Sequence, residues 1–128
     1  MKKAVAGLLA ALLAGCGTDY QARGPDGGFS DKQLGPALWQ VEITTNSYTD
    51  RALIREFALL RSAQLAVQHG YTHFAMTNPH AGSASTRFVE PAADNTVVMF
   101  AGEPLVDGPV FDAVALCARL GPVYQVRC

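Results

Sequence analysis

Hydrophobic and polar residues alternate along residues 38–44 and again along 72–77, which is the pattern of strands with one buried face. Between them, residues 49–69 place apolar side chains three and four positions apart, which predicts a long amphipathic helix that ends at Gly70. Thr49 is its expected N-cap, with Asp50 in the first turn. A strand, a helix and a strand in this order indicate one β-α-β unit if the strands run parallel.

Shorter patterns follow in the last third of the chain. Residues 86–90 are expected to form a short edge strand, 91–95 a turn and 96–101 a buried strand. Asp112 can cap a second helix that runs to about residue 120, and residues 123–127 then predict a last short strand. Together these elements predict an α+β fold, a two-layer sandwich in which two helices cover a small sheet of three to five strands.

The first 36 residues carry a different pattern. Lys2 and Lys3 precede an apolar segment of about ten residues, too short to span a bilayer but long enough for an export signal. Residues 17–36 are rich in Gly, Pro, Asp and Gln and predict a flexible tether, part of which can form an ordered edge of the domain. Within it, Ser30 and Gln33 fit a capping box and predict one helical turn. The expected organisation is a signal peptide at 1–15, a lipidated cysteine and tether at 16–36, and a single α+β domain at 37–128.

The apolar segment closes on the sequence LAGC, residues 13–16. This sequence resembles the lipobox, in which the cysteine thiol receives a diacylglyceryl group and the peptide bond before it is cut. The resemblance implies that Cys16 becomes a lipid-carrying N-terminus, with the domain facing the periplasm. Gly17, where an aspartate would favour retention in the inner membrane, favours the outer membrane. The membrane is thus an expected partner through the lipid on Cys16.

Composition narrows the function classes further. The formal net charge is −1 and there is no basic run, so we expect no nucleic-acid partner. Besides Cys16, the chain has Cys117 and Cys128. In an oxidising compartment they can pair and tie the C-terminal tail to the second helix. Left unpaired, the same two thiols would suit redox or stress sensing.

Candidate chemistry is sparse. Gly70 separates His69 from His73, so the two do not share a helical face, and no ligand spacing indicates a metal site or a cofactor. No catalytic signature surrounds the serines, so no catalytic residue is expected. Glu56 lies within the apolar arc of the helix at 49–69 and needs a partner.

Arg61 lies at the margin of the same arc. With Asn46 and Thr49 at the helix start it would line a small binding groove, because the free N–H groups of a helix N-terminus suit an anion. The alternative is a charge at the rim of the core that reaches water or pairs with an opposite charge.

Four segments carry a resemblance to a known family: YQ with GGFSDKQL (residues 20–21 and 27–34), the strand at 38–44 with Asn46 and Thr49, LLRSAQLAVQHGYTHF (59–74), and MFAGEP with FDA (99–104 and 111–113). Together they are similar to small proteobacterial cell-envelope lipoproteins of uncharacterised function. The resemblance implies an exported, lipid-anchored α+β domain and supplies no catalytic residue. Thr45 stands where that family commonly has Gly, and Gln64 where Glu is usual, so any function that used the Glu would be altered here.

The favoured function is a non-catalytic envelope component that binds a protein, a polymer or a membrane surface. The alternative is a small-ligand binder or enzyme that uses Arg61 and the N-terminus of the helix at 49–69. An exposed apolar patch favours the first. A closed pocket with convergent polar groups favours the second.

Overall fold

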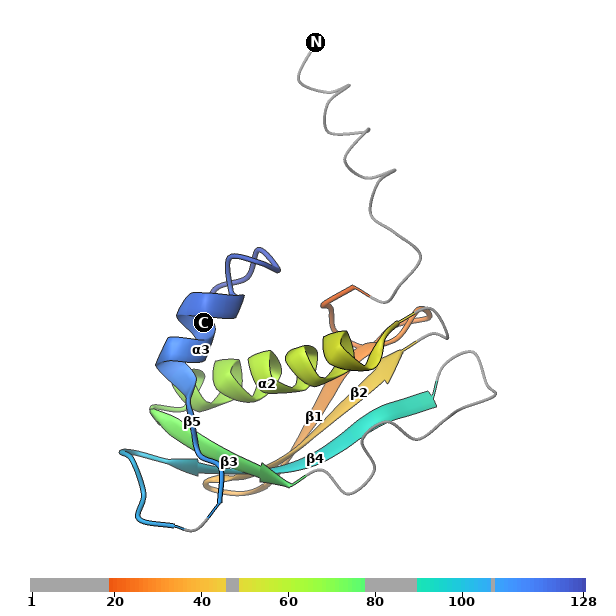
Figure 1. Ribbon diagram of the computed structural model, residues 1–128. Coiled ribbons are helices and arrows are strands. Elements are labelled where there is room, and N and C mark those ends of the chain that lie inside the picture. Colours follow the sequence, from red (N-terminus) through yellow and green to blue (C-terminus); the bar gives the residue numbers. More distant parts are fainter. Residues whose placement is uncertain (1–18, 46–48, 78–89, 107) are drawn as a thin grey trace, which may run out of the picture.

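The computed structural model describes residues 19–45, 49–77, 90–106 and 108–128, and for 90–94 the backbone alone (Figure 1). In chain order the elements are β1 (Gly28–Gly35), β2 (Leu38–Thr45), α2 (Arg51–Gln68), β3 (His73–Thr77), β4 (Glu90–Phe100), β5 (Phe111–Asp112) and α3 (Ala113–Leu120).

The strands form one sheet in the order β1-β2-β4-β3-β5, and every pairing is antiparallel. Both helices lie on the same face of this sheet (Figure 1). The predicted two-layer α+β sandwich is therefore confirmed. Because β2 and β3 are each antiparallel to β4, they run parallel to one another with β4 between them. β2, α2 and β3 thus make the expected β-α-β unit.

The core lies between α2 and the sheet. The alternation seen along β2 is that of a half-buried strand, with Trp39, Val41 and Ile43 all buried. The largest other apolar side chains of the core are Ile54, Phe57, Leu59, Leu60, Leu65, Phe74, Val97, Met99, Leu116 and Leu120. The first five of these come from α2, so this helix supplies most of the apolar surface that covers the sheet.

Local contacts determine where α2 begins and ends. Asp50 is the N-cap, and its side chain accepts a hydrogen bond from the Leu53 backbone N–H at 3.0 Å. Thr49 is therefore not the cap, which corrects the sequence prediction by one residue. At the other end Gly70 has φ of 83°, and the N–H of Tyr71 reaches back to the Ala66 carbonyl at 2.8 Å. This pairing closes the last turn and suits a glycine with positive φ.

Two predictions in the last third of the chain are wrong. Residues 91–95 do not turn: β4 runs from Glu90 to Phe100 without a break, and a register shift next to Pro91 leaves Ala92 of β4 without a partner in β2. Residues 123–127 form no strand: turns run from 121 to 125, and the N–H of Val126 bonds the Gly121 carbonyl at 2.9 Å, within the tail itself. The predicted helix capped by Asp112 is confirmed as α3. Residues 86–89 lie outside the described part of the chain.

The predicted tether is too long. Ser30 and Gln33 lie in β1, which pairs along β2, so they form no helical turn. Ahead of β1, the Phe29 N–H bonds the Gln21 carbonyl and the Arg23 N–H bonds the Phe29 carbonyl, each at 2.8 Å. The domain therefore includes residues 20–36, which a Gly- and Pro-rich composition had assigned to the tether. Within the described residues, no helix has both the length and the hydrophobicity to cross a bilayer.

Candidate functional site

Four aromatic rings from four separate segments meet on the helix side of the sheet. The Tyr20 ring lies 5.0 Å from Phe29 of β1, 5.3 Å from Phe57 of α2 and 5.9 Å from Tyr124 of the C-terminal tail, between ring centroids. Phe57 and Tyr124 are themselves 5.2 Å apart. We call these four residues the aromatic cluster. It joins both ends of the described chain to the sheet and to α2.

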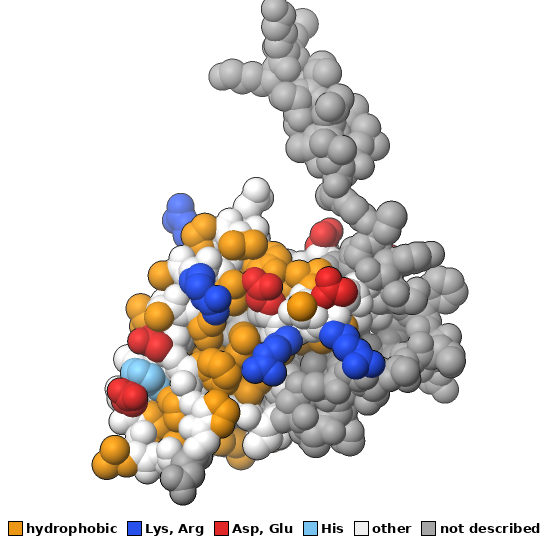
Figure 2. All heavy atoms as spheres, viewed as in Figure 1, with side chains coloured by type: hydrophobic (Ala, Val, Ile, Leu, Met, Phe, Trp, Pro, Cys, Tyr) orange, Lys and Arg blue, Asp and Glu red, His pale blue; other side chains and the backbone are white. Residues whose placement is uncertain are grey.

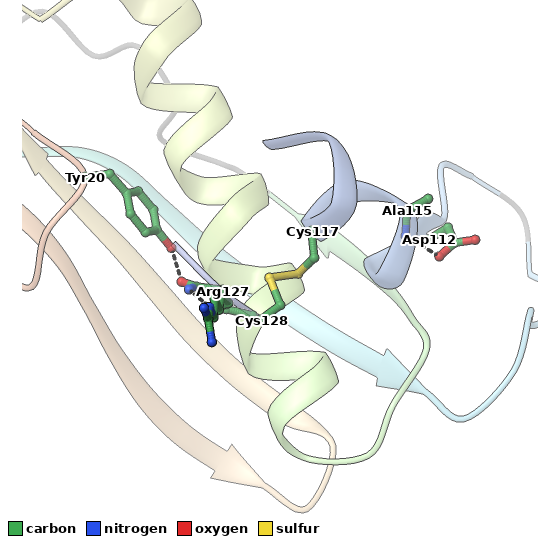
Figure 3. Close-up of a disulfide and its surroundings, with 7 residues drawn as sticks. Tyr20, Asp112, Ala115, Cys117, Arg127 and Cys128 are labelled. Atoms are coloured by element: carbon green, nitrogen blue, oxygen red, sulfur yellow. Dashed lines mark hydrogen bonds between the residues drawn. A yellow bond between two sulfur atoms is a disulfide. The ribbon is translucent and has the colours of Figure 1, made fainter. Parts of the chain in front are cut away.

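Gln64 of α2 links the two chain ends by hydrogen bonds. Its side chain is buried, and its Oε1 accepts a hydrogen bond from the Tyr20 hydroxyl. Its Nε2 donates to the backbone carbonyl of Arg127 at 3.1 Å. Figure 3 shows Tyr20 directed toward the backbone around Arg127 and Cys128. The amide group suits this position because it donates and accepts at once, whereas an ionised glutamate could not donate to the carbonyl.

Arg61 makes a two-point ion pair with Asp31 of β1. The Nε–Oδ1 distance is 2.7 Å and the Nη2–Oδ2 distance is 3.1 Å. The guanidinium carbon also lies 4.4 Å from the centre of the Phe29 ring. The two side chains are only 16% and 17% exposed, so water screens the pair little. The structure therefore gives Arg61 an opposite charge as partner, the second of the two alternatives left open by the sequence.

The predicted binding residues are not brought into one site. Arg61 lies ten residues beyond the start of α2, which is about 15 Å along the helix axis. Thr49 precedes that start, and Asn46 lies outside the described residues. Arg61 thus faces β1 and the aromatic cluster, several helical turns away from Thr49.

Glu56 has a tyrosine as its partner. Glu56 lies beside the Tyr124 hydroxyl. Burial raises the pKa of Tyr124 to about 12, with a further contribution from the nearby Glu56. Burial likewise raises the pKa of Tyr20, against the opposing effect of the Arg61 charge. Both phenols therefore stay protonated at neutral pH.

The cysteines at the C-terminal end are joined. Cys117 of α3 and Cys128 form a disulfide with a Cα–Cα distance of 5.9 Å (Figure 3). The tail is thus held by Tyr124 in the aromatic cluster, by the Gln64–Arg127 hydrogen bond and by the disulfide. Cys16, the predicted lipidation site, lies outside the described residues.

The described surface has shallow hollows. One hollow of about 430 Å³ lies beside the disulfide and is lined mainly by apolar side chains: Val67, Val114, Cys117, Ala118, Pro122, Val126, Arg127 and Cys128. A hollow of about 200 Å³ on β1 and β2 has a polar lining that includes Asp31, Lys32 and Glu42. No group of three metal-ligating side chains occurs within the described ranges.

The two described histidines, His69 and His73, contact different residues. The Nδ1 of His69 is 2.9 Å from the Leu65 carbonyl, and its ring packs edge-on against Trp39. The Nδ1 of His73 is 2.8 Å from the Thr72 hydroxyl.

Comparison of the chain with known protein families, curated proteins and solved structures finds no match. Its site is therefore interpreted from its own residues.

The sequence did not predict that Tyr20 and Gln64 contact one another, although one signal for this contact was present. Gln64 lies four positions after Leu60 and seven after Phe57, inside the apolar arc of α2, so its amide needed a partner as Glu56 did.

Proposed function

We propose that this chain is an envelope lipoprotein, held to a membrane by lipid on Cys16, whose domain is a non-catalytic binding or structural component. The proposal is supported first by the order of Lys2 and Lys3, an apolar segment and the LAGC sequence. The observation that carries it is the position of Cys16, four residues before Tyr20 of the aromatic cluster. Cleavage before Cys16 would leave every described residue of the domain in place.

The polar groups of the site support a non-catalytic role. Arg61 is bound to Asp31, Gln64 is bound to Tyr20 and Arg127, and Glu56 lies beside Tyr124. Each of these contacts ties one segment of the chain to another. The alternative of a small-ligand binder or enzyme built on Arg61 would require this guanidinium to leave a bidentate ion pair with little exposure to water.

Location follows from the same N-terminal sequence. Gly17 after the cysteine favours the outer membrane, with the domain facing the periplasm. The partner would be an envelope protein or polymer near that membrane, because the chain between Cys16 and the domain is short.

The test is the chemical state of Cys16. The full chain is expressed in a Gram-negative host, and the purified protein is examined by mass spectrometry of its N-terminal peptide. We expect a peptide that begins at Cys16 and carries a diacylglyceryl thioether and a fatty amide. The variant C16S should keep residues 1–15 and stay unlipidated, whereas the matched variant C117S/C128S should be lipidated normally. A mature protein with a bare Cys16 thiol, or one that retains residues 1–15, would overturn the proposal.

A further inference from the structure

We infer that the surface formed by α3 and the C-terminal tail lies against the membrane to which the protein is anchored. This inference rests on the proposed lipid at Cys16. We call this surface the α3–tail face. Its exposed residues are Val114, Ala115, Ala118, Arg119, Pro122, Val123, Gln125, Arg127 and Cys128.

The α3–tail face combines apolar and basic side chains. Val114 and Val123 are 54% and 63% exposed, and the apolar hollow beside the disulfide lies between α3 and the tail. Residues 113–128 contain two arginines and no aspartate or glutamate. At the upper left of Figure 2, over α3 and the tail, hydrophobic and basic side chains gather, with acidic side chains at the border of this area. Such a surface suits a bilayer that contains anionic lipid headgroups.

The chain path places the anchor on the same side of the molecule. Tyr20 packs against Tyr124 of the tail, and Gln64 bonds both Tyr20 and Arg127. Four residues of fully extended chain reach at most about 14 Å, so the lipid on Cys16 would attach within that distance of Tyr20. The start of the described chain and the tail both lie on the helix side of the sheet (Figure 1). A connection this short holds that side toward the bilayer.

A second copy of the chain fits the α3–tail face less well. In a two-fold symmetric interface the same surface meets itself. Arg119 and Arg127 of both copies would then lie in the interface with no aspartate or glutamate side chain from residues 113–128 to neutralise them. Anionic headgroups supply the missing opposite charge. We therefore assign the face to the membrane.

Photo-crosslinking tests the assignment. The lipidated full-length protein is reconstituted in vesicles of phosphatidylethanolamine and phosphatidylglycerol, with benzoylphenylalanine in place of Val123. A matched protein carries the probe in place of Val98, which is 39% exposed and pairs with Leu38 and Ala75 on the strands beside it. We expect several-fold more phospholipid adduct from position 123 than from position 98. The variant R119Q/R127Q should reduce the adduct at position 123, since it removes the basic groups and leaves the Arg127 carbonyl in place.

The outcomes separate this inference from the proposed function. If Cys16 carries lipid but positions 123 and 98 give equal adduct, the α3–tail face does not meet the bilayer and the inference fails alone. An adduct with a second copy or with another protein at position 123 overturns it in favour of a protein interface. If the N-terminal peptide carries no lipid, the proposed function fails and the inference fails with it.

Discussion

Arg61 and Arg23 each pair with a carboxylate but in different surroundings. Arg61 meets Asp31 through two bonds, and both side chains are mostly buried. Arg23 meets Glu42 through one contact of 3.2 Å, and the two side chains are 54% and 26% exposed. Charges in water are screened and gain little from pairing, whereas a buried carboxylate left without its partner is costly. Loss of one partner should therefore lower the free energy of unfolding more for the Arg61–Asp31 pair than for the Arg23–Glu42 pair.

The first prediction follows from this difference. We expect R61M to lower the free energy of unfolding by about 2 kcal/mol, because it leaves Asp31 unpaired beside the Phe29 ring. The matched control R23M should change it by less than about 0.5 kcal/mol. Urea unfolding of both variants, followed by tryptophan fluorescence, measures the two values. Equal effects would contradict a structural role for the Arg61–Asp31 pair.

Residue-level predictions from the sequence succeeded where local geometry decides and failed where distant segments meet. The helix cap at Asp112 depends on the four residues that follow it, and it was predicted correctly. The partner of Arg61 is Asp31, 30 residues away on the edge strand β1, and the composition of this segment had predicted a tether. The contact between Tyr20 and Gln64 spans 44 residues. Helical angle indicated that Glu56 needed a partner, but it could not name that partner.

Among the elements, β1 depends on one close backbone approach. Gly28 has φ of 135°, and a Cβ there would lie 2.4 Å from the Gln21 carbonyl oxygen and 2.7 Å from that of Ala22. Residues 21–23 can pair with the outer edge of β1 because Gly28 has no side chain. This contact brings Tyr20 over Phe57 and so positions the aromatic cluster.

The second prediction tests this approach. We expect G28A to lower the free energy of unfolding by about 2 kcal/mol or more, through the strained φ and the clash with residues 21–22. Trypsin should also cut faster after Arg23, since residues 21–23 would leave the edge of β1. G102A is the matched control, because a Cβ at Gly102 would meet no atom within 4 Å, and its effect should stay within about 0.5 kcal/mol. Trypsin cleavage at the parental rate in G28A would argue against this contact.

The third prediction concerns the C-terminal tail. The Cys117–Cys128 bridge spans 11 residues of chain, and closing so short a loop stabilises a fold by about 3 kcal/mol in the chain-entropy model. We expect C117S/C128S to unfold at correspondingly lower urea concentration, with faster amide exchange in residues 121–128. A reducing agent should destabilise the parent to the same extent and leave the variant unchanged. If the variant is as stable as the parent, the hydrogen bond from Gln64 and the packing of Tyr124 suffice to hold the tail.

The predictability of the elements follows from their patterns. α2, β2 and α3 were predicted because periodic patterns within each segment specify them, although the N-cap of α2 was placed one residue early. β1 was missed because glycines and polar residues at a sheet edge have the composition of a linker. β4 was interrupted in the prediction because Pro91 was taken as the start of a turn, whereas a register shift at Ala92 of β4 accommodates the proline within the sheet.

At the scale of the whole molecule, the length of chain between Cys16 and the domain determines how far the domain can lie from the membrane. A tether of about twenty residues would let the domain sample roughly 25 Å from the membrane. The structure assigns most of those residues to the domain, and only residues 17–19 separate Cys16 from Tyr20. Under the proposed anchoring, the domain would lie next to the bilayer with a restricted orientation. A restricted orientation leaves the far side of the sheet as the surface open to partners in the envelope.

The last prediction tests the effect of this short connection. Inserting about twenty glycine and serine residues between Gly17 and Thr18 would restore a reach of roughly 25 Å without touching any residue of the aromatic cluster. We expect lipidation of Cys16 and the thermal unfolding midpoint to stay unchanged, while phospholipid adduct from the probe at position 123 falls toward the level at position 98. An insertion of the same length between Gly108 and Pro109, outside the helices and strands, is the control and should leave the adduct at position 123 as in the parent. Undiminished adduct after the N-terminal insertion would mean that the α3–tail face binds lipid by its own affinity, and the short connection would then not be what orients the domain.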